Sequence, residues 1–130
     1  MKKRILRWLP AVTMMMLIFI ASGTPGDEVP TFEGIDFIIK KGGHMIGYAM
    51  LAIACYLAAY GSNHNQVRSS VLSLCLAVTY AASDEYHQSF IPGRSATVMD
   101  VGIDSAGAIA GVILMNFMVR RRWRGKEAAV

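Results

Sequence analysis

Long uncharged stretches constrain the fold of this chain more than any other feature. Nineteen residues separate Arg7 from Asp27, and as an α-helix they span about 28 Å, enough to cross the hydrocarbon core of a bilayer. Three further apolar stretches follow, and charged residues make up only 17 % of the chain, below the roughly one quarter usual in soluble domains. We therefore predict an all-α integral membrane bundle of about four transmembrane helices. Their expected bounds are 5–22, 44–60, 67–86 and 99–119, in a single domain 1–130.

The basic residues predict the orientation of these helices. Four of them lie at the start of the chain, Arg68 lies before the third stretch and five lie at the end, which makes ten of the thirteen. Because cytoplasmic flanks are enriched in Lys and Arg, both termini are predicted to be cytoplasmic in a multi-pass protein of the plasma membrane. Basic residues next to apolar stretches also argue against nucleic acid as a partner.

The first stretch has two interpretations. It is either a retained membrane helix or a secretory signal peptide, since a basic start, an apolar middle and the small residues Ala21 and Gly23 suit both. Both place the segment 23–43 outside the cell, where 35–39 is expected to form a short amphipathic piece at the membrane surface. A short polar loop is expected at 61–65.

Polar residues are predicted to gather at the outer ends of the helices. Lys40, His44 and Tyr48 are four residues apart and share one helix face, as do Asp100 and Asp104 further along the chain. Buried carboxylates and histidines are costly in membranes and persist where they pair or line a polar cavity. The ligand-binding candidates are Lys41, His44, Tyr48, Asp84, Glu85, Gln88, Arg94, Asp100 and Asp104.

Each group also has a purely structural interpretation. Asp84 and Glu85 would then pair with Arg94 or Lys41 to hold the loops together, and Asp100 would cap the last helix. The pattern Gly107-x-x-x-Gly111 suits close helix contact, either within the bundle or in a homodimer. The two cysteines lie in apolar stretches and predict neither a disulfide nor a metal site.

The pattern of these residues resembles that of a known protein family. The arrangement is similar to that of VanZ-like proteins over about residues 40–115, and its most specific part is Asp84-Glu85-x-x-Gln88 with Pro92-Gly93-Arg94. The resemblance implies a polytopic protein of the bacterial envelope, in a family whose namesake is associated with low-level resistance to the glycopeptide teicoplanin. This chain departs from the family pattern at Asp104, where members of the family often carry Asn. The resemblance does not imply a settled biochemical activity.

Two functional hypotheses remain open. In the first, the outer site binds an envelope lipid, a cell-wall precursor or a glycopeptide antibiotic, without a cofactor or a metal. In the second, a membrane enzyme acts on a lipid phosphate or related ester, with His44 or His87 as general base or metal ligand. Asp84, Glu85 and Asp100 would then be further ligands or acids. The sequence carries no recognised phosphatase or H-E-x-x-H signature, so no catalytic residue is assigned.

Overall fold

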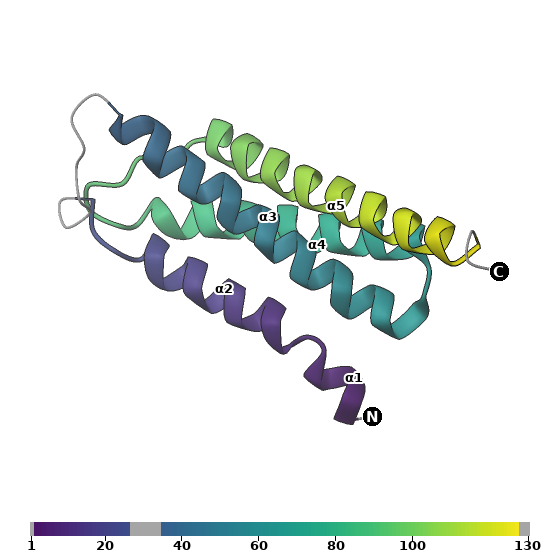
Figure 1. The fold of residues 1–130 in the computed structure, drawn as a ribbon. Coiled ribbons are helices and arrows are strands. Elements are labelled where there is room, and N and C mark those ends of the chain that lie inside the picture. The colour runs from purple at the N-terminus through teal and green to yellow at the C-terminus, as the bar shows by residue number, and fades with distance from the viewer. Residues whose placement is uncertain (1, 27–34, 128–130) are drawn as a thin grey trace.

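The chain folds into an elongated bundle of helices. The computed structural model describes residues 2–26 and 35–127, and every regular element in those residues is helical. The helices are α1 (Lys2–Leu6), α2 (Leu9–Ser22), α3 (Asp36–Asn63), α4 (Gln66–Gln88) and α5 (Val98–Glu127). α1, the α3–α4 turn and the end of α5 lie at one end of the bundle, and the α4–α5 connection lies at the other (Figure 1). The all-α prediction is confirmed.

Two predicted boundaries were wrong around the second stretch. The expected surface piece at 35–39 is instead the first part of α3, which continues through Gly42 and Gly43 without a break. The predicted loop at 61–65 is also too long, because α3 runs to Asn63. His64 then adopts a left-handed conformation (φ 54°), and the side chain of Asn65 accepts the Arg68 backbone N–H to begin α4.

The backbones of α3 and α5 approach each other closely. A Cβ at Gly107 would overlap the backbone carbonyl of Met45, and one at Gly111 would lie 2.5 Å from the carbonyl oxygen of Ala49. The two glycines therefore let the backbones approach as the small-residue pattern predicts. This face of α5 is filled by α3 of the same chain, so the structure supports the packing interpretation and gives no support to a homodimer through it.

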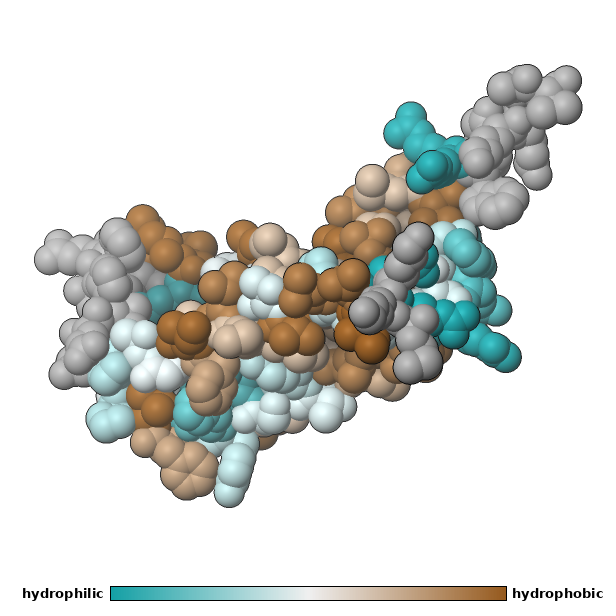
Figure 2. Space-filling view, turned by 90° about the horizontal axis from the view of Figure 1, so that it is seen from below, coloured by the Kyte–Doolittle hydropathy of each residue, from teal (hydrophilic) through white to brown (hydrophobic). Residues whose placement is uncertain are grey.

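The surface of the bundle is apolar along its middle. On α2 only Ala11 and Ser22 are buried, whereas Met16, Phe19 and Ile20 are each more than half exposed. Hydrophobic side chains dominate the middle of the face seen in Figure 2, and strongly hydrophilic ones lie mainly toward its ends. Such exposed apolar surface is expected where lipid, not water, surrounds the helices.

Within the described residues, three helices meet the length and composition expected of a membrane span. They are Arg4–Ser22, Ile38–Asn63 and Val98–Arg122. α4, the third stretch in the prediction, is not among them, so the expected number of four is not confirmed. Its sequence is diluted by serines, of which Ser69 and Ser73 are fully buried and donate to backbone carbonyls four residues earlier.

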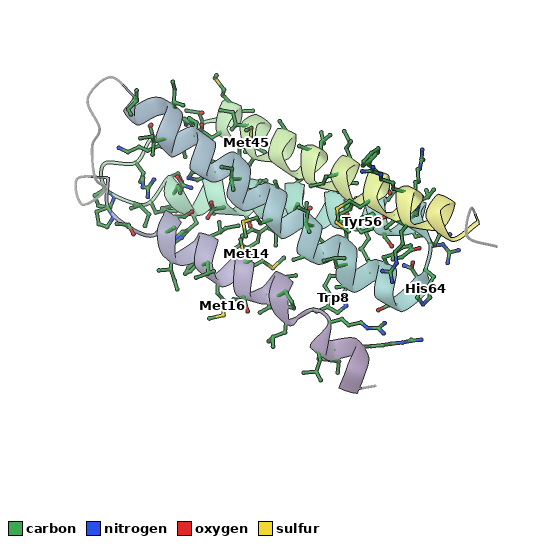
Figure 3. All side chains as sticks on the ribbon, in the orientation of Figure 1. Trp8, Met14, Met16, Met45, Tyr56 and His64 are labelled. Carbon is green, nitrogen blue, oxygen red and sulfur yellow. The ribbon has the colours of Figure 1, made fainter. Side chains whose placement is uncertain are left out.

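A polar contact ties three helices together in the half of the bundle near the α3–α4 turn. The Tyr56 hydroxyl donates to Asn116 Oδ1 over 2.9 Å, and Asn116 Nδ2 donates to Ser70 Oγ over 2.9 Å. Figure 3 shows Tyr56 between α3 and α5, with His64 at the end of the bundle near the turn. The two cysteines are free, with Cys55 buried and Cys75 exposed.

Candidate functional site

The three predicted polar groups meet at the end of the bundle farther from the chain termini. The first turns of α3 and α5 and the last turn of α4 lie there, at the left in Figure 1. Three of the nine candidates are half-buried: Lys41, His44 and Arg94. The other six are buried: Tyr48, Asp84, Glu85, Gln88, Asp100 and Asp104. Residues far apart in the sequence thus form one group of mixed charge.

One part of this group fastens α2 to α4. Ser22 Oγ donates to Asp84 Oδ2 over 2.7 Å, and Gln88 Nε2 donates to the same oxygen over 3.1 Å. All three side chains are less than 5 % exposed. Asp84 and Gln88 therefore have at least a structural role, because they link α4 to α2. Ser22, the last residue of α2, belongs to the same polar group.

The structural interpretation allowed Arg94 to pair with Asp84 or Glu85. In the described residues Arg94 instead donates hydrogen bonds to backbone carbonyls. Its Nε donates to the carbonyl oxygen of Thr24 over 3.0 Å, and its Nη2 donates to that of Ala21 over 2.9 Å. These carbonyls lie at the C-terminus of α2, where the helix dipole favours a cation. The left-handed Gly93 (φ 71°) places Arg94 in this position after α4 has ended.

The start of α5 is organised by Thr97 and not by Asp100. Thr97 Oγ1 accepts the Asp100 N–H and donates to Asp100 Oδ2 over 2.9 Å, while the Thr97 N–H donates to Glu85 Oε2 over 3.1 Å. Asp100 forms an ion pair with Lys41 of α3. These contacts fix the loop before α5 against both neighbouring helices.

A further group consists of His44, Glu85 and Asp104, each of which offers an atom within 4.8 Å of the other two. Asp104 is fully buried, and its Oδ1 lies 3.5 Å from His44 Nδ1, a distance for an ion pair but long for a hydrogen bond. Neither carboxylate oxygen of Asp104 accepts a hydrogen bond from the described residues. Leaving a charge buried without such bonds typically costs several kcal/mol, so this arrangement is not explained by stability.

A cavity of about 290 Å³ opens above these residues. Its lining carries both signs of charge and includes the two glycines Gly26 and Gly93. The lining side chains with polar heads are Lys40, Lys41, His44, Glu85, Gln88, Arg94, Ser95 and Asp100. His44 borders both the cavity and buried Asp104, so it connects the open space with the buried cluster.

The comparisons with known proteins identify the family. The family model described as VanZ/LLP1 matches residues 7–119, which is most of the chain. The chain belongs to the VanZ/LLP1 family. Neither a curated protein nor a solved structure matches it. The resemblance to VanZ-like proteins is therefore confirmed and extends into α2, well before residue 40.

In this VanZ/LLP1 chain, His44 and His87 lie in different surroundings. His44 belongs to the site, whereas the ring of His87 stacks on Phe19 with centroids 4.6 Å apart. Of the two histidines named in the enzyme hypothesis, the structure thus brings only His44 to the buried carboxylates. Tyr48 lies one turn deeper than His44, fully buried, with its ring 6.3 Å from that of Tyr80.

Two site residues were missed in the sequence. Thr97 could have been found, because Thr97-x-x-Asp100 before an apolar stretch is the signature of a helix N-terminus. Ser22 carries no such signal, because a single serine at the end of an apolar stretch does not indicate a functional site. Its partner Asp84 is 62 residues away, and their contact depends on how α2 packs on α4.

Proposed function

We propose that this VanZ/LLP1-family protein crosses the plasma membrane four times, with both termini in the cytoplasm. α4 would be the fourth span, because its buried serines satisfy their hydroxyls within the helix and Val71, Leu72 and Val78 face outward. Arg68 and the arginines of α5 lie at one end of the bundle and the cavity lies at the other. The positive-inside rule then puts the cavity on the extracytoplasmic side.

In this proposal the cavity binds the phosphate of an envelope lipid or of a lipid-linked cell-wall precursor. The observation that carries it is the cluster of three cations, Lys40, Lys41 and Arg94, around one opening at the end of an apolar bundle. Among the described residues, the hydrogen-bond partners of Arg94 are neutral carbonyls, so its positive charge is available to an anion. A guanidinium held in place in this way suits a phosphate.

The position of the cavity also favours a lipid over a soluble anion. Exposed apolar side chains are close in sequence to residues that line the cavity. Phe90 follows Gln88 at the end of α4, and Met99 precedes Asp100 at the start of α5. A ligand with a phosphate head and hydrocarbon chains would place the head in the cavity and the chains along this surface. The acids and Gln88 would contact hydroxyl or amine groups of the head.

Binding of labelled lipids to the purified full-length protein in detergent tests this proposal. The probes are phosphatidylglycerol, a polyprenyl phosphate and, as the zwitterionic reference, phosphatidylcholine. We expect an anionic lipid to bind more tightly than phosphatidylcholine, and Arg94→Gln to weaken that preference about tenfold, a typical loss for a charged hydrogen bond. Whether phosphatidylglycerol or the polyprenyl phosphate binds better distinguishes bulk lipid from a cell-wall precursor.

Arg120→Gln is the matched control, because it removes the same charge at the opposite end of the bundle. Equal weakening by both variants would show unspecific attraction of anionic lipid and would contradict the proposal. Teicoplanin and vancomycin susceptibility of cells expressing wild type, Arg94→Ala or Glu85→Gln at matched membrane levels forms a second arm. Protection by wild type that either variant loses would link the cavity to glycopeptide tolerance.

A membrane enzyme acting on a lipid phosphate or related ester is the second candidate. The observation that favours it is the placement of His44, a potential general base, at the boundary between the cavity and two buried carboxylates. Release of phosphate from the bound lipid by wild type, but not by His44→Gln, would support this candidate over simple binding.

A further inference from the structure

Three side chains from three different helices converge below the cavity. His44 of α3, Glu85 of α4 and Asp104 of α5 each offer a nitrogen or oxygen atom, and these atoms all lie within 4.8 Å of one another. Among the described residues they are the one such grouping of at least three histidine, cysteine or acidic side chains. One imidazole and two carboxylates are ligands that a divalent metal ion accepts.

The spacing of these atoms is close to that of a metal site. Zinc lies about 2.0–2.2 Å from nitrogen and oxygen ligands, so two ligands at a tetrahedral angle are roughly 3.4 Å apart. The 3.5 Å between His44 Nδ1 and Asp104 Oδ1 already matches this value. One oxygen of Glu85 completes the group, and the three ligand atoms all lie within 4.8 Å of one another.

The burial of Asp104 is the independent observation that points to a ligand. Its side chain is fully buried and faces His44, yet neither oxygen accepts a hydrogen bond from the described residues. Buried carboxylates in proteins are as a rule hydrogen-bonded, paired or bound to metal. A partly exposed histidine at 3.5 Å provides a single incomplete contact, whereas a cation between the side chains would use both Asp104 and Glu85.

The surrounding contacts fix the position of Glu85. The Thr97 N–H donates to Glu85 Oε2, and Thr97 is itself fixed by Asp100 at the start of α5. Hydrogen bonds from neighbouring groups orient carboxylate ligands in the same way at known metal sites.

The geometry points to a divalent metal site formed by His44, Glu85 and Asp104 at the floor of the cavity. A borderline ion such as Zn²⁺ fits best, because the imidazole disfavours Mg²⁺ and Ca²⁺ and the two carboxylates balance its charge. Three protein ligands leave a fourth position on the side of His44, which borders the cavity. The site does not depend on which lipid enters the cavity, or on whether any reaction follows.

Zinc binding to the full-length protein tests this inference without any assumption about a lipid. The protein is purified in detergent without a histidine tag, stripped with a chelator and titrated with Zn²⁺ against a chromogenic competitor. We expect one high-affinity zinc ion per chain in wild type. Asp104→Asn, Glu85→Gln and His44→Gln should each weaken it at least about tenfold, the loss that even supporting residues of metal sites cause.

His64→Gln is the matched control, since it removes a histidine from the exposed turn between α3 and α4. It should bind zinc as wild type does. The inference is overturned if stripped wild type binds no stoichiometric zinc, or if His64→Gln loses as much affinity as His44→Gln. Circular dichroism and size-exclusion chromatography select variants that fold, and three separate ligand variants keep the test decisive if one does not.

A thermal scan gives a second readout of the same site. A metal that binds the folded state raises the melting temperature in proportion to the logarithm of its concentration. Added Zn²⁺ should therefore raise the melting temperature of wild type and leave that of Asp104→Asn unchanged. If both respond equally, the zinc lies elsewhere. Failure of lipid binding with intact zinc binding would instead reject the proposed function alone.

Discussion

The contact between α3 and α5 at Gly111 can be tested by adding a single methyl group. Gly111→Ala would place a Cβ 2.5 Å from the carbonyl oxygen of Ala49, whereas ordinary contact begins at 3.4 Å. The helices must therefore separate by about 0.9 Å, since a backbone carbonyl cannot rotate away as a side chain can. Overpacking of this kind costs about 1–3 kcal/mol, partly offset by the helix propensity of Ala, about 1 kcal/mol better than Gly.

Gly102→Ala in the same helix is the matched comparison. Nothing lies within 4 Å of a Cβ at Gly102, so this substitution adds helix propensity without a clash. We expect Gly111→Ala to lower the free energy of unfolding by about 1 kcal/mol, and by no more than about 2 kcal/mol. Gly102→Ala should raise it by up to about 1 kcal/mol. Titration with sodium dodecyl sulfate, followed by circular dichroism, measures both in the same detergent.

The opposite signs make this comparison informative about the site. Gly107 contacts the backbone of Met45, next to His44, so separation of α5 from α3 would also move Asp104 away from His44. If Gly111→Ala is as stable as Gly102→Ala, α3 does not fill this face of α5. The packing that brings Asp104 to His44 would then be wrong.

Two further predictions concern topology and the second polar contact. Single cysteines at Ser95 and Asn63, in a variant without the native cysteines, should react with a membrane-impermeant maleimide in intact cells at Ser95 only; labelling at Asn63 instead would invert the proposed orientation. Asn116→Ala removes the hydrogen bonds to Tyr56 and Ser70 and should lower the free energy of unfolding by about 1–2 kcal/mol in the same titration. A loss no larger than that of an exposed alanine substitution in α5 would show that this contact does not hold the three helices.

The sequence alone determined that this is a helical membrane protein and that its polar residues gather at one end of the bundle. Uncharged stretches and basic flanks need no tertiary contact to be recognised, because bilayer thickness and charge asymmetry act on each segment separately. The alternation of helix direction then places the start of α3, the end of α4 and the start of α5 at one end of the bundle. This is why candidates such as His44, Glu85 and Asp104 could be named before their contacts were known.

The tertiary structure decided which of these residues meet. Spacing within one helix shows that Asp100 and Asp104 share a face, but the rotation of α5 against α3 sets their partners. Asp100 therefore pairs with Lys41, while Asp104 is buried beside His44. Arg94 was expected to pair with a carboxylate, yet the path of the chain after Gly93 brings it to the end of α2. Such pairings depend on helix rotation and loop path, which residue type and spacing do not encode.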